Sequence, residues 1–397
     1  MKDYKLHVSE GFKDIYGKEM LIKKELENKV FNIFKSYGYE LIKTPGVEYQ
    51  DVYTLGKGYK PELYNLINRQ GEILSLRSDM TSSVARFIST NKKLQNGIKK
   101  YSYIADTYRY PRQYQGKNHQ FLQAGIELIG DKSVEADIQT IYLASHILKE
   151  CNIKNYTINL GSTLFLKTLF NDFNLSDEIV KNIMNSIEEK DYVLLSEYLN
   201  NNVSSDKAKF IIDLMMRGGR LNYIEKLMKQ LQGTKSYEVL KYLKKIYMTL
   251  KELELDNIIF DFSIFSYQEY YTGIIFKIYI DSVTKEVVSG GRCDSLFKEY
   301  GFDTPNVGFG IDLDILTDYV YRFNLLNVES EKYLAFSNEK TFVNAMIQNQ
   351  KFRDQSIIVS QINNLESLDK AMEYAKMNNF TKIIVYKENG FELKEVK

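Results

Sequence analysis

The residues best placed to do chemistry in this sequence are an amide and a carboxylate on either side of a glycine. Gln123, Gly125 and Glu127 occupy alternate positions, and the positions between and beside them are apolar: Leu122, Ala124, Ile126 and Leu128. Alternation with a period of two predicts a β-strand whose polar residues share one face. A small polar ligand could lie over the position without a side chain. The alternative is a half-solvated strand in which Gly125 marks only a bulge.

A second predicted strand, Tyr271–Ile280, also carries a polar face. Tyr271, Gly273 and Lys277 share that face, and the opposite face is formed by Thr272, Ile274, Phe276, Ile278 and Ile280. For Tyr271 and the tyrosine before it, a packed aromatic pair is an alternative to ligand contact. The sequence Gly290-Gly291-Arg292 follows, and such paired glycines usually form a tight turn. Its position after two strands of binding type favours a place near the same site.

Helical and extended patterns surround these two strands. Residues 21–37 carry apolar side chains at the 3.6-residue spacing of a helix, which Gly38 would end in a left-handed C-terminal cap. Strands are predicted at Tyr39–Lys43 and Ile258–Ile264.

From about Phe165 to Leu255 the pattern is helical and rich in leucine, lysine and glutamate. We expect a helix to begin after Ser176, with Gly218-Gly219 breaking the block. From about Lys332 a separate pattern begins, in which helices and strands alternate. The predicted elements there are strands Tyr333–Phe336, Ser356–Ser360, Lys382–Tyr386 and Phe391–Lys394 and helices near Lys340–Asn349 and Leu365–Met377, with a turn containing Asn389-Gly390.

The composition limits the classes of function. With 397 residues, 44% of them hydrophobic, the chain can form two or three domains with buried cores. Lysine and arginine total 53 against 52 acidic residues, so bulk charge offers no basic surface for nucleic acid. The two cysteines and three histidines are too scattered for a metal site, and no cofactor is implied. Without an apolar signal core or an 18-residue apolar run, we expect a soluble, cytoplasmic protein.

Four ordered segments resemble the catalytic core of class II aminoacyl-tRNA synthetases, in particular the histidyl-tRNA synthetase branch. Together they run from about residue 10 to about residue 320. The matching segments are Gly38–Pro45 with Glu48 (first motif), Leu76–Thr81 with Ala85-Arg86, Tyr108–Glu127 (second motif), and Glu269–Phe276 with Ser289–Asp294 and Gly308–Ile311 (histidine-recognition and third-motif region). The resemblance implies an α+β fold, with an antiparallel sheet flanked by helices, and a homodimer interface around Pro45.

The resemblance also assigns a ligand pocket. Free histidine has an ammonium, a carboxylate and an imidazole with one donor and one acceptor nitrogen, so its site needs acids, a cation and amphoteric partners. The residues matching the family's histidine-binding positions are Asp79, Thr81, Arg109, Gln123, Glu127 and Tyr271.

The departures from the family pattern fall on the ATP side of the site. The expected arginines and acid are replaced by Pro111, Lys117, His119, Ser266 and Ile315. Arginines hold phosphate oxygens in pairs, and losing one preorganised charge contact costs roughly 3–4 kcal/mol of transition-state stabilisation. The loop around Arg112 and Lys117 is more simply interpreted as a solvated loop than as a phosphate cradle. Adenylate formation is therefore not expected.

A retained histidine pocket beside a lost ATP site is similar to one group in this family, the regulatory subunits of ATP phosphoribosyltransferase. This resemblance implies no catalysis by the chain itself, activation of a short catalytic subunit in the first step of histidine biosynthesis, and a part in feedback inhibition by histidine. Whether that histidine binds this pocket or an interface with the partner stays open. The alternatives are a divergent histidyl-tRNA synthetase and a synthetase-like protein that binds an amino acid for another regulatory purpose.

We expect two domains. A class II synthetase-like core should span residues 1–325, with a helical insertion at about 165–255, and a small α/β domain should span 330–397. The second is shorter than the anticodon-binding domain of a histidyl-tRNA synthetase and carries acids among its lysines. No tRNA partner is expected.

Overall fold

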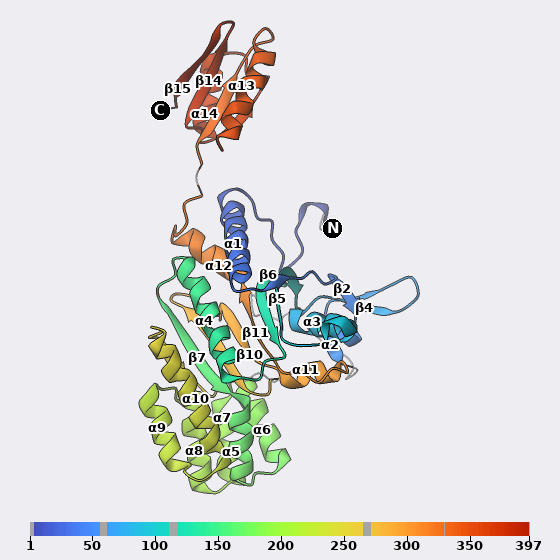
Figure 1. Ribbon diagram of the computed structural model, residues 1–397, viewed down its shortest axis with the longest axis vertical. Coiled ribbons are helices and arrows are strands. Elements are labelled where there is room, and N and C mark those ends of the chain that lie inside the picture. The colour runs from blue at the N-terminus through green and yellow to red at the C-terminus, as the bar shows by residue number, and fades with distance from the viewer. Residues whose placement is uncertain (1–3, 56–61, 111–117, 265–270, 329, 397) are drawn as a thin grey trace. The chain divides into compact units, whose positions relative to one another are not determined.

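The computed structural model describes residues 4–55, 62–110, 118–264, 271–328 and 330–396. The chain forms two compact units, Met1–Leu326 and Asn327–Lys397 (Figure 1).

An eight-stranded sheet is the centre of the first unit. The strand order is β1-β5-β6-β11-β10-β9-β7-β8. The pairs from β5 to β7 are antiparallel, and only the edge pairs, β1 with β5 and β7 with β8, are parallel. The strands are β1 (Glu40–Leu41), β5 (Lys99–Tyr108), β6 (Gln120–Ile129), β7 (Tyr156–Ser162), β8 (Ile258–Phe260), β9 (Ile274–Ile280), β10 (Val288–Arg292) and β11 (Asn306–Asp312).

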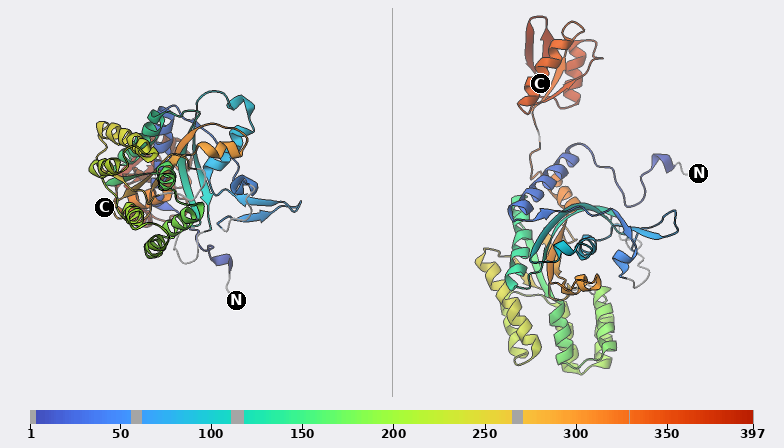
Figure 2. Two further views of the ribbon diagram at one scale, coloured as in Figure 1. Left: turned by 90° about the horizontal axis from the view of Figure 1, so that it is seen from below. Right: turned by 45° about the vertical axis from the view of Figure 1, so that its right-hand side comes forward.

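Helices cover both faces of this sheet. Helices α1 (Gly17–Ser36), α4 (Val134–Glu150) and α12 (Leu313–Arg322) pack on one face, where α1 contacts α12 (Figure 1). Helices α3 (Met80–Ser89) and α11 (Asp294–Glu299) share a buried cluster with Tyr101 and Tyr103 of β5 on the other face (Figure 2, right).

A small three-stranded antiparallel sheet lies beside α3. Its order is β2-β4-β3, with β2 (Val47–Tyr49), β3 (Asn65–Ile67) and β4 (Ile73–Leu76). Short helical segments also occur at Tyr4–Leu6 (a 3-10 turn), Asp51–Thr54 (α2) and Lys92–Leu94 (a 3-10 turn).

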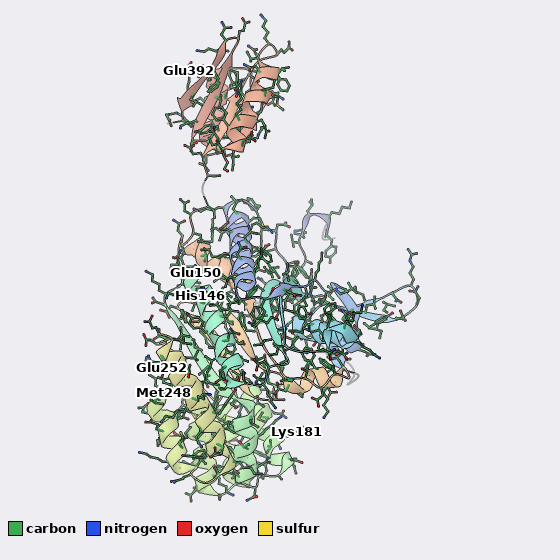
Figure 3. All side chains as sticks on the ribbon, in the orientation of Figure 1. His146, Glu150, Lys181, Met248, Glu252 and Glu392 are labelled. Carbon is green, nitrogen blue, oxygen red and sulfur yellow. The ribbon has the colours of Figure 1, made fainter. Side chains whose placement is uncertain are left out.

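Six helices form the block between the parallel neighbours β7 and β8. They are α5 (Thr163–Asp172), α6 (Asp177–Glu188), α7 (Tyr192–Asn202), α8 (Ser205–Met216), α9 (Leu221–Gln230) and α10 (Lys235–Glu252). Ser176 caps α6 as predicted, because its hydroxyl accepts a hydrogen bond from the Ile179 amide. Helix α10 also packs against α4 outside the block (Figure 3, where Met248 marks α10 and His146 marks α4).

The second unit is a small sheet between two helices. Its strand order is β13-β12-β14-β15, parallel except for the hairpin of β14 and β15. The elements are β12 (Lys332–Phe336), α13 (Phe342–Asp354), β13 (Ile358–Gln361), α14 (Leu368–Met377), β14 (Lys382–Lys387) and β15 (Gly390–Glu395). Alternate residues of β12 enter separate cores, Tyr333 and Ala335 on one face and Leu334 on the other.

The predicted fold class is confirmed, but several predicted boundaries were wrong. The helix at 21–37 begins earlier, at Gly17, and Gly38 follows it with φ of +80°, in the left-handed region as expected. The strand predicted at Tyr39–Lys43 is only Glu40–Leu41, and the one predicted at Ile258–Ile264 ends at Phe260. The second polar-faced strand begins at Ile274, so Tyr271 and Gly273 precede it.

Within the described residues, no helix is both long and apolar enough to cross a membrane. Likewise, that part of the chain contains no group of three His, Cys, Asp or Glu side chains able to hold a metal ion.

Candidate functional site

A pocket of about 210 Å³ opens on the face of the large sheet that carries α3 and α11. Strands β6, β9, β10 and β11 supply its floor. The six residues expected to bind a ligand come from separate segments of the chain, and all of them line it: Asp79, Thr81, Arg109, Gln123, Glu127 and Tyr271.

Glu127 is the most deeply buried carboxylate of the pocket, with 2% of its surface exposed. It is paired across the sheet with Gly308, where a Cβ atom would lie 2.5 Å from Oε2 of Glu127. Nδ2 of Asn306 donates a hydrogen bond to Oε2 over 2.8 Å. Burial raises the pKa of Glu127 to about 7; donation from Asn306 and Thr81 opposes the rise, and the charge of Asp79 adds to it. The carboxyl can therefore change its charge near neutral pH.

The glycine between Gln123 and Glu127 makes room for a protein side chain. Gly125 pairs in regular register with Tyr103 and Gly310, so the alternative of a bulge is wrong. A Cβ atom at Gly125 would lie 2.4 Å from the Tyr103 hydroxyl oxygen. The space expected for a ligand directly over Gly125 is thus occupied by the end of the Tyr103 ring.

Asp79 and Thr81 lie at the start of α3. The carboxylate of Asp79 caps this helix, accepting from the amides of Thr81 (3.3 Å) and Ser82 (2.9 Å) and from the Ser82 hydroxyl (2.8 Å). Asp79 therefore has a structural role in addition to lining the pocket, and the cap holds its charge close to Glu127.

Gln123 and Tyr271 offer complementary polar atoms. Oε1 of Gln123 is buried and accepts no hydrogen bond from any described residue, which leaves an acceptor available to a ligand donor. Tyr271 packs against Gly291, where a Cβ atom would lie 2.8 Å from its ring. Burial raises the pKa of Tyr271 well above its ordinary value, so its hydroxyl stays protonated at neutral pH.

Arg109 supplies a cation. Its Nε donates to the carbonyl oxygen of Ser78 over 2.8 Å, and its guanidinium carbon lies 5.4 Å from the centre of the Phe121 ring. The ammonium of Lys285 lies at the same distance from that ring and pairs with Asp312 over 3.0 Å. Both cations are favourably placed over the aromatic ring.

The described departures from the synthetase pattern leave no arginine where the third motif would place one. Ile315 lies in the first turn of α12, which Asp312 caps by accepting from the Asp314 and Ile315 amides. The neighbouring Asp314 pairs with Lys23 over 2.6 Å. His119 is 7% exposed, and its Nδ1 is hydrogen-bonded to the Tyr64 hydroxyl. This histidine is a packed structural side chain.

Several residues singled out in the sequence lie outside the described residues. These are Pro111, Arg112, Lys117, Ser266, Glu269 and Tyr270.

Sequence reasoning missed several residues of the site. Tyr103, Lys277 and Cys293 line the pocket, and Asn306 contacts Glu127 behind it. Lys277 had been assigned to the polar face of its strand, which is a usable signal. Tyr103 and Asn306 are brought in by the pairing of β5 and β11 with β6, and that long-range pairing has no local signal in the sequence.

The fold and the pocket define a class II aminoacyl-tRNA synthetase-like protein of the histidyl branch. The family model described as histidyl-tRNA synthetase matches residues 11–316. The structure of a histidyl-tRNA synthetase from Nostoc sp. PCC 7120 has a TM-score of 0.82 at 19% identity, covering 98% of this chain and 95% of that one, which shows the shared fold.

More specific similarities extend over both units. An ATP phosphoribosyltransferase regulatory subunit of Clostridium kluyveri is 31% identical over 392 residues, covering 96% of this chain and 98% of that protein. The protein of the same name from Clostridium novyi is 27% identical, covering 98% and 94%. An ATP phosphoribosyltransferase regulatory subunit/histidyl-tRNA synthetase structure from Bacillus halodurans has a TM-score of 0.85 at 25% identity, covering 97% and 99%. The chain belongs to the family of ATP phosphoribosyltransferase regulatory subunits.

Proposed function

We propose that this chain assembles with a short catalytic subunit of ATP phosphoribosyltransferase, activates it, and takes part in feedback inhibition by histidine. The observation that carries the proposal is the match of regulatory subunits to 96% or more of the chain, including the C-terminal unit. The site supports it, because ligand-binding groups are kept in the amino-acid pocket while the described ATP-side positions lack the expected arginines.

The pocket suits free histidine chemically. An imidazole needs one acceptor and one donor, which the ionised Glu127 and the Tyr271 hydroxyl can provide. The ammonium group needs acceptors, and Oε1 of Gln123 and the carboxylate of Asp79 both face the same cavity. Arg109 can supply a cation for the carboxylate. These five assignments, and the place of Thr81 in the same pocket, are part of the proposal.

We also propose that the chain forms a homodimer through the region around Pro45. The small sheet that follows Pro45 exposes large apolar side chains, among them Ile67 with 76% of its surface accessible. The other large apolar side chains exposed nearby are Leu41, Val47, Tyr49, Leu66 and Ile73. Covering this area would remove apolar surface from water. A symmetric dimer presents each contact surface twice, so catalytic subunits should join in equal number and close a symmetric assembly.

The purified chain is expected not to activate histidine. Adenylation needs cations on the triphosphate, and the third-motif position holds Ile315 in place of an arginine. The measurement is histidine-dependent pyrophosphate–ATP exchange, with an authentic histidyl-tRNA synthetase as the positive control. Exchange at the rate of the control would show that the chain is a divergent synthetase. A trace rate would not, because substrate binding alone leaves residual catalysis.

Reconstitution with the catalytic subunit encoded in the same genome tests the proposed function. The two chains should co-elute on size exclusion at micromolar concentration, in equal numbers by light scattering. Separate elution would contradict the assembly.

A further inference from the structure

Asn306 is fully buried behind the pocket and hydrogen-bonded to its central carboxylate. It lies in β11 two residues before Gly308, which pairs directly with Glu127. Because alternate residues of a strand share a face, Asn306 is the diagonal neighbour of Glu127, within reach of its carboxyl. The amide donates through Nδ2 over 2.8 Å, while its Oδ1 accepts from no described residue.

The backbone around Asn306 is held independently of any ligand. The backbone N–H of Asn306 donates to Oδ1 of Asp294 over 3.0 Å, and its backbone carbonyl oxygen accepts from the Cys293 backbone N–H over 2.7 Å. The same Asp294 oxygen accepts from Arg292 over 3.3 Å. Arg292 in turn pairs with the buried Asp137 over 2.8 Å. The side chain of Asn306 is therefore aimed at Glu127 before a ligand arrives.

We propose that Asn306 is a positioning residue that stabilises the ionised, acceptor-only form of Glu127, in which the carboxylate can accept a ring N–H from the ligand. The inference rests on the proposed histidine pocket. A donating amide favours the charged carboxylate over the neutral acid, because only the carboxylate has both oxygens free to accept. The N–H of a neutral imidazole hydrogen-bonds more strongly to the carboxylate than to the neutral acid.

Apart from the second donor, Thr81, the described groups closest to Glu127 do not stabilise its charged form. Burial raises the pKa values of Tyr103, Tyr271 and Cys293 well above their ordinary values and also raises that of Tyr39, so these groups stay neutral near pH 7. Asp79 raises the pKa of Glu127 through its charge. Thr81 is the second donor, and the remaining charged groups of the pocket are Arg109, Lys277 and Glu286.

Removing the donor should move the pH dependence of binding. Burial already raises the pKa of Glu127 to about 7, and losing a donor raises it further. Histidine affinity should fall as the pH is lowered through the pKa of Glu127, and in Asn306→Ala and Asn306→Leu this fall should occur roughly one to two pH units higher, as expected for the loss of one hydrogen bond to a charged group. Calorimetric titration from pH 6 to 9 measures this shift. Triazolylalanine, whose ring stays neutral over that range, excludes titration of the ligand as its cause.

Asn349→Ala is the matched control. Asn349 is also fully buried and hydrogen-bonded through its side chain, but in the other unit, with Gln361 and Tyr386 as partners. The Asn349→Ala variant should leave the pH midpoint of histidine binding unchanged. Midpoints of the Asn306 variants equal to that of the wild type would overturn the proposal and leave Asn306 a packing residue.

A ligand-free measurement separates this inference from the proposed function. The infrared band of the Glu127 carboxylate, identified by difference from Glu127→Gln, should titrate at higher pH in Asn306→Ala than in the wild type. If no histidine binds the wild type at any pH, the histidine assignment fails, while the infrared titration still decides the role of Asn306. An infrared titration of Glu127 that is unchanged in Asn306→Ala would overturn the proposed role of Asn306.

Discussion

Replacing Glu127 with alanine should lower histidine affinity at least tenfold at pH 8. At that pH the carboxyl, with a pKa of about 7, is largely ionised in the wild type and available to a ring N–H. Removing one partner of a buried, hydrogen-bonded charged contact typically costs about 2–5 kcal/mol. Calorimetric titration of the wild type and the variant measures the difference. Equal affinities would place the ligand elsewhere, for example at an interface with the partner.

The Glu127→Gln variant can show that the loss of histidine affinity is not caused by a loss of stability. The pKa of Glu127 is about 7 in the folded protein and 4.5 in the unfolded chain, so the wild type loses stability as the pH rises between these values. The loss approaches about 3 kcal/mol above pH 7, at 1.36 kcal/mol per pH unit. Glutamine cannot ionise, and Oδ1 of Asn306 is available to accept from it. The Glu127→Gln variant should therefore be more stable than the wild type at pH 8 while binding histidine more weakly.

Replacing Arg292 with alanine should destabilise the first unit by about 3–5 kcal/mol, the usual result of leaving one partner of a buried ion pair uncompensated. Arg292 is 7% exposed, and its partner Asp137 is fully buried. The guanidinium also donates to the carbonyl oxygens of Asp131 (3.0 Å) and Ser133 (3.2 Å), which would lose their donor. Denaturant unfolding at pH 8 measures the effect.

Lowering the pH should reduce the difference in unfolding free energy between Arg292→Ala and the wild type. Burial raises the pKa of Asp137, Arg292 opposes that rise, and without Arg292 the carboxyl can become neutral by binding a proton. The control is Arg217→Ala, which breaks an exposed pair with Asp213 over 2.5 Å and should cost less than about 1 kcal/mol. An Arg292→Ala variant as stable as that control would mean that the buried cluster around Asp137 contributes little.

The local patterns of the sequence were sufficient for the elements that carry the pocket. The alternation of residues 122–128 predicted β6 and the shared face of Gln123 and Glu127, because a period of two depends only on neighbouring residues. The helix ended by Gly38 and the helix capped by Ser176 were likewise predicted from nearby side chains.

Contacts between distant segments could not be predicted in this way. The pairing of β5 with β6 brings the Tyr103 hydroxyl over Gly125, and the pairing of β11 with β6 brings Asn306 to Glu127. Asp79 was expected in the pocket, but its use as the cap of α3 depends on where that helix begins. Sequence reasoning therefore found the polar groups of the pocket and missed the residues that pack against them and orient them.

The most direct test of the central claim is the rate of phosphoribosyl-ATP formation by the catalytic subunit, measured with and without this chain. The rate should rise when the two are mixed at equal concentrations, and millimolar histidine should lower it again. Histidine can inhibit only by binding the low-activity state more tightly, and a coupling of about 1–3 kcal/mol, roughly 5–150-fold, would be ordinary. Glu127→Ala should still activate but should need more histidine for inhibition. A catalytic subunit equally active alone would contradict the assignment.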